Sequence, residues 1–334
     1  MNIEIGSFIE LDLKNTGEYY NGKDDIARLN SARAGIYHAC KVLRCSTICI
    51  PYYLCPTVKN FLAKNGVKVK PYFISNEFEP KDLKQINNQA VLIVNYFGIM
   101  SSEKIRILAK RFENVIVDNS GGFYTVPLED CYNVYSPRKF FGVPDGCYVI
   151  GKDANNLTSE YAQDFSSDTS SFLLKRIEYG SSKIYSERME NEERIDRSGI
   201  LLMSALTKAL LNGIDYLHIV HKRKENFLIA HDLFKNINLF DPIQLYSDDC
   251  VPMVYPLVVE DMDLTGKLKR KNIYVGRLWN DVLKEVPDNS FEAMLSKYLV
   301  PIPIDQRYSS QELMYIRDCV INKKKISGSW FYSI

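Results

Sequence analysis

The stretches AVLIVNYFG at 90–98 and VIVDNSGG at 115–122 decide the fold class. Each begins with a short, continuous apolar run and then turns polar, at Asn95 in the first stretch and at Asp118 in the second. Strands that are apolar on both faces are typical of a parallel sheet covered by helices on both sides. The two stretches therefore predict an α/β fold built on a mostly parallel sheet.

Helical and strand-like segments alternate around these stretches, from residue 30 to residue 150. We expect helices at 32–44, 57–65, 81–86 and 102–112, and strands at 47–50, 67–74, 90–96, 115–117, 133–135 and 147–150. After residue 152 we expect polar helical segments to about residue 194, a long helical region over 195–234 and then a mixed α+β pattern. The sequence thus predicts a large α/β domain over 1–234 and a smaller C-terminal α+β domain over 235–334.

Composition and charge exclude several classes of protein. The 334 residues are 46% hydrophobic and 25% charged, as in a soluble globular protein. With 42 Lys and Arg against 41 Asp and Glu, the net charge of +1 predicts no general attraction to nucleic acid or to an anionic membrane. No apolar run approaches the roughly 20 residues of a membrane helix, and the N-terminus lacks the pattern of a signal peptide. Eight cysteines without a CxxC pair or metal-ligand spacing favour a reducing cytoplasm and no metal site.

Candidate functional residues follow the predicted strands, where ligands of open α/β sheets bind. They are found at 52–55, at Asn95 and at Asp118, and Lys139 stands 139 − 118 = 21 positions beyond Asp118. The aromatic pair at 140–141 makes the loop of Lys139 apolar, and a desolvated lysine has a lowered pKa that suits Schiff-base chemistry. Taken alone, Asp118 is more readily explained as a turn residue and Lys139 as a solvated lysine.

Small residues in LNSARAG at 29–35 open the first predicted helix. Its N–H groups and the Ser31 hydroxyl are suited to an anion, although Ser31 is equally explained as an ordinary N-cap. One chemical interpretation accounts for all three features: the anion-binding segment at 29–35, the acid after a strand and the lysine in an apolar loop. Ser31, Ala32 and Arg33 would bind the phosphate of pyridoxal 5′-phosphate, Asp118 would keep its pyridine nitrogen protonated, and Lys139 would bond to it.

Six segments of the chain carry a resemblance to a known family. They are Asn30–Ala34 for a phosphate loop SGTxAL, Ile50–Cys55 for a strand end vPsfTf, Val117–Ser120 for EDaA, Ser136–Lys139 for hPtK, Asp145–Gly146 for Glu-Gly and Leu299–Ile304 for vLPlhp. On these segments the chain resembles the DegT/DnrJ/EryC1/StrS aminotransferases, the sugar-aminating branch of the fold-type-I pyridoxal-phosphate enzymes. The resemblance covers most of the chain. It implies catalytic roles for Lys139 and Asp118, and cofactor contacts from Ser31, Ala32, Arg33, Tyr53, Cys55, Asn95, Ser120 and Ser136.

Three positions depart from the family pattern. Cys55 stands where an aromatic residue commonly stacks on the cofactor ring, so Cys55 itself or Tyr53 is expected to cover the ring. Gly121 replaces a Gln or His, and Val134 replaces a serine for which Ser136 is the expected substitute. The retained lysine argues against the dehydratase branch of the family, which has histidine in its place.

The resemblance implies an aminotransferase that moves an amino group, with glutamate as the expected donor, to a nucleotide-linked keto-sugar in surface-polysaccharide synthesis. Two alternatives stay open: another pyridoxal-phosphate reaction on an amino-acid-like substrate, and a non-catalytic binding module. The resemblance also implies a homodimer with shared active sites. Independently, the segment 155–195 is too charged for a core and too long for a simple connection. We therefore expect it to reach a neighbour's pocket and to offer Arg176, Arg188 and Arg194 to the anionic substrate.

Overall fold

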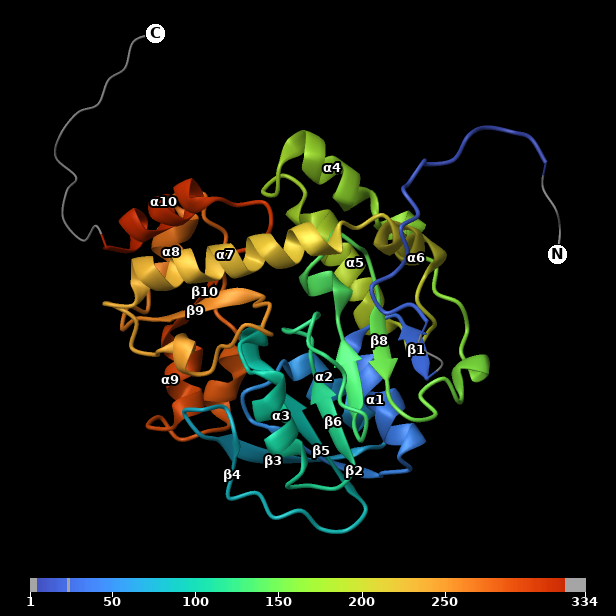
Figure 1. The fold of residues 1–334 in the computed structure, drawn as a ribbon, viewed down its shortest axis with the longest axis horizontal. Coiled ribbons are helices and arrows are strands. Elements are labelled where there is room, and N and C mark those ends of the chain that lie inside the picture. Colours follow the sequence, from blue (N-terminus) through green and yellow to red (C-terminus); the bar gives the residue numbers. More distant parts are fainter. Residues whose placement is uncertain (1–4, 23–24, 322–334) are drawn as a thin grey trace, which may run out of the picture.

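The computed structural model describes residues 5–22 and 25–321, which form an eight-stranded and a two-stranded sheet (Figure 1). The large sheet has the strand order β1-β8-β7-β6-β5-β2-β3-β4. Its strands are β1 Ile26–Leu29, β2 Thr47–Pro51, β3 Lys68–Ile74, β4 Pro80–Lys81, β5 Gln89–Val94, β6 Val115–Asp118, β7 Tyr132–Tyr135 and β8 Cys147–Ile150. Strands β7, β6, β5, β2 and β3 run parallel, whereas β8 is antiparallel to both of its neighbours and β4 is antiparallel to β3. The predicted α/β fold with a mostly parallel sheet is confirmed.

Three helices connect the parallel strands: α1 Ala32–Val42, α2 Pro56–Lys64 and α3 Ser102–Ala109. Helix α1 packs on β6, β7 and β8, and Gly35 allows the closest approach. A Cβ atom at Gly35 would lie 2.6 Å from the Sγ atom of Cys147 and 3.0 Å from a methyl carbon of Val149, so only glycine fits there. This contact fixes the start of α1 close to the start of β8.

Two expectations about helices are wrong. Residues 81–86 are not helical, because the chain leaves β4 through Asp82, whose φ of +52° is incompatible with a right-handed helix. The helical region over 195–234 is divided into the end of α5 Tyr185–Arg197, then α6 Ala205–Asn212 and α7 Tyr216–Phe234. Between α5 and α6 the chain is extended, and Leu202 bridges Leu29 of β1. The extended segment forms because this backbone pairs with the edge of the large sheet.

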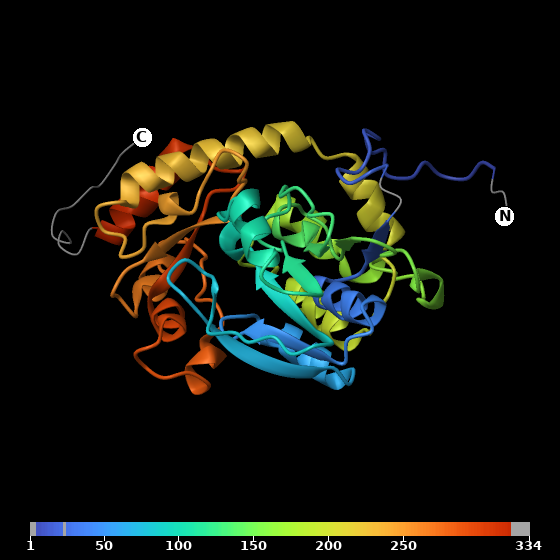
Figure 2. The same ribbon diagram turned by 60° about the horizontal axis from the view of Figure 1, so that its bottom comes forward.

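The C-terminal part contains a small sheet of β9 Val254–Val258 and β10 Leu299–Pro303 with α8 Leu264–Lys269, α9 Phe291–Tyr298 and α10 Ser310–Ile321. Helix α7 packs against α10 and β9 and extends to the region of α6 (Figures 1 and 2). Phe227 of α7, Tyr255 of β9 and Val91 of β5 belong to one continuous apolar core. The boundary between the two domains stays a prediction.

Candidate functional site

The carboxyl ends of β5, β6 and β7 lie side by side. Asn95, directly after β5, donates its backbone N–H to the carbonyl of Asp118 at 3.0 Å, and Asp118 pairs with Val134 of β7 in the parallel register. Ser136 follows β7 and precedes a 3₁₀ turn over Pro137–Lys139. The structure therefore brings Asn95, Asp118 and Lys139 to the edge of the sheet where ligands of α/β proteins bind.

Asp118 is a buried acid at the end of β6, with 5% of its surface exposed. Its Oδ1 atom accepts the backbone N–H of Ser120 at 2.9 Å. Burial raises the pKa of the Asp118 carboxyl, although the hydrogen bonds from Ser120 and the positive charge of Lys139 act in the opposite direction. Asp118 thus closes a turn and also places a carboxyl within electrostatic reach of Lys139.

Lys139 is exposed in the chain, and the expectation that its loop would desolvate it is wrong. The two phenylalanines that follow are buried, Phe140 to 3% and Phe141 to 6% exposure, and they pack among aromatic side chains that include Phe123. The turn therefore directs the rings into the core and leaves the lysine ammonium group open to solvent.

The start of α1 lies at the same edge of the sheet. The carbonyl of Asn30 accepts the N–H of Gly146, the residue before β8, at 2.8 Å. Ser31 is the N-cap of α1: its hydroxyl accepts the N–H of Ala34 at 3.4 Å, and the first turn contains no acidic residue. The N–H group of Ala32 has no partner within the helix, as at any helix start. Together with the helix dipole, this terminus is suited to an anion.

The Arg33 guanidinium finds hydrogen-bond or ion-pair partners in the chain for only some of its N–H groups. Its side chain is 10% exposed, and its Nη1 atom lies 2.5 Å from Oδ1 of Asp196. The Nε and Nη2 atoms are buried and have no hydrogen-bond partner among the residues that the structure describes. Burial lowers the pKa of the Arg33 guanidinium, and the nearby charge of Arg138 acts in the same direction. Such a guanidinium next to a helix N-terminus fits the phosphate of pyridoxal phosphate.

Tyr53 and Cys55, the two residues expected to cover the cofactor ring, have different positions. Tyr53 is fully buried, and its ring contacts the edge of Trp279 at a centroid distance of 4.6 Å. Cys55 is partly exposed, with its Sγ atom 3.1 Å from Oγ1 of Thr57. Cys55 is also near enough to Arg33 to influence its pKa. The structure therefore places Cys55 at the site and Tyr53 in the core.

Asn95 is a structural residue of the site edge. Its Nδ2 atom donates to Asn119 and Thr125, both at 3.0 Å, and its Oδ1 atom accepts the N–H of Met100 at 3.3 Å. These bonds fix the turn after β5, where Gly98 has a φ of +72°. A Cβ atom at Gly98 would lie 2.1 Å from the carbonyl oxygen of Gly121. A Cβ atom at Gly121 would lie 3.1 Å from both the carbonyl oxygen of Asn95 and the backbone nitrogen of Phe97, which favours a small residue at 121, where the family has a larger one.

The two serines of the site differ in their surroundings, and the acid-Gly motif has a structural role. Ser120 hydrogen-bonds Asp118, whereas Ser136 is buried and its hydroxyl makes no capping bond to the following turn. Asp145 is fully buried, and its carboxylate accepts the hydroxyls of Ser204 at 2.6 Å and Thr207 at 2.9 Å. Asp145 therefore anchors the start of α6.

Sequence reasoning missed two acids on α5 and an arginine beside Lys139. Glu192 forms an ion pair with Arg138, and Asp196 forms the pair with Arg33 described above. Burial alone would raise the pKa of the Glu192 carboxyl, but the positive charges of Arg138, Arg188 and Lys139 outweigh burial and lower it. The spacing of the two acids by four residues on a helix was the available signal, since it places them on one face.

The arginines proposed from the segment 155–195 are not equivalent. Arg194 is paired within the chain: its Nη1 atom lies 2.6 Å from Oδ1 of the buried Asp164, and its Nε donates to Thr169 at 2.9 Å. Its Nη2 atom is buried and has no partner among the described residues, and its contact with a substrate stays a prediction. Arg176 and Arg188 are exposed. Although Arg176 is exposed, partial desolvation of its guanidinium and the charges of Arg307 and Arg188 lower its pKa, while Asp305 acts in the opposite direction.

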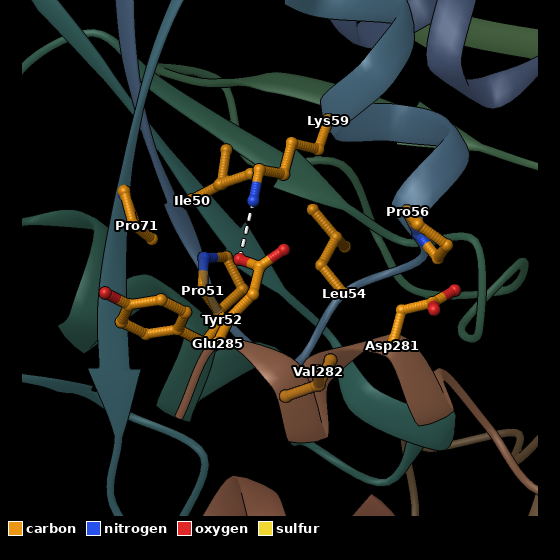
Figure 3. A pocket seen from close by; sticks show the side chains of 10 residues that line it. All are labelled: Ile50, Pro51, Tyr52, Leu54, Pro56, Lys59, Pro71, Asp281, Val282 and Glu285. Carbon is orange, nitrogen blue, oxygen red and sulfur yellow. Dashed lines mark hydrogen bonds and ion pairs between the residues drawn. The ribbon is translucent and has the colours of Figure 1, made fainter. Parts of the chain in front are cut away.

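A small cavity of about 30 Å³ lies beyond β2, between α2 and the 3₁₀ turn Asn280–Lys284 (Figure 3). Lys59 and Glu285 face each other across it at 2.5 Å. Neither Lys139 nor Asp118 lines this cavity, and its volume is that of about one water molecule. Within 5–22 and 25–321, no group of His, Cys, Asp and Glu side chains is arranged to hold a metal ion.

Comparison with known proteins identifies the fold. Sugar aminotransferase CalS13 from Micromonospora echinospora is 14% identical, with a TM-score of 0.64 over 91% of this chain and 88% of that chain. The chain has the fold of the sugar aminotransferases. A DegT DnrJ EryC1 StrS aminotransferase from Brucella abortus is 12% identical, with a TM-score of 0.58 over 90% of this chain and 86% of that chain. The predicted fold-type-I architecture is thus confirmed.

DesV from S. venezuelae, solved in complex with a ketimine intermediate, shares this sugar aminotransferase fold. It is 16% identical, with a TM-score of 0.58 over 89% of this chain and 84% of that chain. No protein-family profile and no curated protein matches the sequence. At these identities the likeness is one of fold.

Proposed function

We propose that this protein is a pyridoxal-phosphate-dependent aminotransferase of the DegT/DnrJ/EryC1/StrS type. The substrates would be an amino acid, with glutamate as the expected donor, and a nucleotide-linked keto-sugar for surface-polysaccharide synthesis. The observation that carries the proposal is the meeting of Asp118, Lys139 and the start of α1 at one edge of the sheet. The residues fit the cofactor because Arg33 offers two unpartnered, buried N–H donors beside a helix N-terminus. The fold shared with enzymes of this chemistry supports it.

Each of these residues has a distinct task in the proposed reaction. When bound, pyridoxal phosphate supplies an aldehyde that accepts the amino group and a ring that withdraws electrons. Ser31, Ala32 and Arg33 would hold the phosphate, and Cys55 would lie against one face of the ring. Asp118 would hold a proton on the ring nitrogen, because a buried carboxylate stabilises an adjacent positive charge. Lys139 Nζ would anchor the cofactor and then move a proton to and from the α-carbon of the donor.

The exposure of Lys139 is compatible with these tasks. An ammonium group in solvent is free to turn toward a substrate that enters from the open edge of the sheet, and Asp118 lies within electrostatic reach of it. Water would be excluded from this lysine only after the cofactor and the substrate cover it. We therefore expect Lys139 to become reactive only when cofactor and substrate occupy the site.

Absorbance and chemical trapping test the proposal directly. The purified protein should be yellow or become yellow with pyridoxal phosphate, and borohydride should fix the cofactor on the peptide that contains Lys139. Lys139→Arg, which keeps the charge, should lose both properties, whereas the exposed Lys284→Arg should keep them. A protein that stays colourless when pyridoxal phosphate is added would support the alternative of a non-catalytic binding module. Colour without amino transfer to keto-sugars would support a different reaction on amino acids.

We further propose a cytoplasmic homodimer with shared sites. All eight cysteines are free thiols, as expected in a reducing compartment. The α4–α5 hairpin, formed by α4 Ser171–Tyr179 and α5, leaves Leu174, Ile177 and Tyr179 more than half exposed, which is costly unless another surface covers them. The described residues include no helix with the length and apolar character of a membrane span.

Subunit mixing tests the shared sites. Two inactive variants, Lys139→Ala and Arg176→Ala, should regain activity after subunit exchange, because some mixed dimers would hold one intact site. The interface should bury about 2,000 Å² or more, as in obligate dimers. A fully active monomer at micromolar concentration would contradict the proposal.

A further inference from the structure

Helix α5 lies against the residues that would bind the cofactor phosphate. Asn191 donates its side-chain N–H to the carbonyl of Pro144 at 2.7 Å, in the loop that follows Lys139. Directly after the C-terminal end of the helix, the Ser198 hydroxyl and the Gly199 carbonyl accept the side-chain amide of Asn30, just before α1, at 3.0 and 3.1 Å. The C-terminal half of α5 therefore connects the loop after Lys139 with the phosphate loop.

Between these anchor points, α5 presents its two carboxylates to two arginines. Glu192 pairs with Arg138, which precedes Lys139, and Asp196 pairs with Arg33 at the start of α1. Arg138 and Glu192 are both near enough to Arg33 to influence its pKa, so the four groups form one cluster. The cluster still leaves Nε and Nη2 of Arg33 buried and unpartnered.

Two carboxylates do not satisfy these guanidiniums as well as one phosphate would. A guanidinium presents its donors in a planar fork that an oxyanion can accept in pairs, whereas Asp196 contacts only Nη1 of Arg33. The side chain of Asp196 is 49% exposed, so its ion pair is weakened by solvent. The unpartnered donors of Arg33 therefore favour exchange of the carboxylates for an anion of higher charge.

We propose that Arg33 and Arg138 form a receptor for a phosphate dianion, and that Glu192 and Asp196 of α5 occupy it as an internal, competing anion until phosphate displaces them. This inference rests on the proposed function, since the cofactor would supply the phosphate. It adds Arg138 as a phosphate ligand and makes α5 a strap that opens when the site is filled. The dianion of a nucleotide would present the same chemistry.

Calorimetric titration of inorganic phosphate into the cofactor-free full-length protein tests the receptor. Glu192→Gln removes the competing charge and should tighten phosphate binding about tenfold. Asp196→Asn, at a half-exposed position that tolerates change, should act in the same direction. Glu193→Gln, on the same helix but paired with the exposed Arg197, should bind phosphate as the unchanged protein does. Unchanged affinity in both Glu192→Gln and Asp196→Asn would overturn the inference.

A double-mutant cycle separates competition from a general change of charge. Arg138→Gln should weaken phosphate binding, and in that background Glu192→Gln should no longer tighten it, because the two groups act on each other. Amide hydrogen exchange should become faster over 185–197 when phosphate is added. An equal gain from Glu192→Gln with and without Arg138, or slower exchange over α5, would contradict the strap.

Failure of this inference can be distinguished from failure of the proposed function. Phosphate binding is measured without pyridoxal phosphate and needs no bond to Lys139, so it does not depend on the amino transfer that the proposed function requires. If the protein is yellow but its phosphate affinity does not change in Glu192→Gln or Asp196→Asn, the proposed function stands and the phosphate receptor is contradicted. If the protein stays colourless but these variants bind phosphate more tightly, the receptor stands and the proposed function is contradicted. Competition of phosphate with pyridoxal phosphate, or instead with a nucleoside diphosphate, would identify the source of the dianion.

Discussion

The carboxyl edge of the sheet and helix α5 both bring charged groups to the candidate site, but they hold them differently. Asp118 is fixed by the strand register of β5, β6 and β7, and its carboxyl is buried. Glu192 and Asp196 are held by ion pairs on a helix of which only Asn191 and Ile195 are buried. A strand end cannot move without loss of sheet hydrogen bonds, whereas an ion pair can exchange its partner. The edge is therefore the rigid part of the site, and α5 is the replaceable part.

Substitution of alanine for Gly98 at the edge, and for Gly180 in the α4–α5 hairpin, should give the largest difference in stability between the two regions. Gly98→Ala adds a strained positive φ and a backbone clash, so we expect the free energy of unfolding to fall by about 4 kcal/mol or more. Gly180→Ala, between α4 and α5, strains the backbone only, because nothing lies within 4 Å of the added Cβ. We expect about 2 kcal/mol there. Denaturant unfolding measures both, and equal losses would break the contrast between a rigid edge and a replaceable helix.

Removal of the Asp118 charge should affect turnover strongly. Asp118→Asn keeps the hydrogen bond from the Ser120 N–H but cannot hold a positive charge on the cofactor ring. Turnover should fall about 10²–10³-fold, as when a positioned electrostatic group is removed, while some cofactor still binds. Steady-state kinetics with Glu193→Gln as the matched acid on α5 measures this effect. Near-normal turnover in Asp118→Asn would leave Asp118 with its turn role only.

The stability of the cofactor-free protein should depend on pH through Asp118. Burial raises the pKa of its carboxyl in the folded chain, so the folded state binds the proton more tightly than the unfolded state. The contribution of this group to stability is thus present below the ordinary aspartate pKa and is lost as pH rises through the raised pKa. As pH rises through this range, the melting temperature of Asp118→Asn should increase relative to that of the unchanged protein. A difference that does not vary with pH would contradict the raised pKa.

The smallest effect is expected for an ion pair of α5 that faces solvent. Glu193 and Arg197 lie 3.0 Å apart on the exposed side of the helix, with 59% and 81% of their side chains exposed. Arg197→Ala should change the melting temperature by less than about 1 °C, because solvent screens such a pair. A larger shift would mean that the outer face of α5 is covered, as by a second subunit.

The buried strands and the order of the motifs could be predicted because each depends on neighbouring residues in the chain. A run such as 90–94 is apolar on both faces wherever it lies, and Asp118 follows its strand directly. The direction of the Lys139 side chain could not be predicted in this way. It depends on the aromatic side chains, distant in sequence, that receive Phe140 and Phe141. The pairing of α5 with Arg33 and Arg138 was missed for the same reason, since it joins residues more than 50 positions apart.

The sequence by itself determined the α/β alternation, the polar residues at the strand ends and the identity of the lysine and the acid. These follow from local patterns of burial, because a strand covered on both faces needs apolar side chains throughout. The tertiary structure alone decided that Tyr53 lies in the core, that Lys139 is exposed and that two carboxylates of α5 meet two arginines of the site. Such contacts depend on packing between distant segments, and a side chain's charge does not specify which of many opposite charges it will meet.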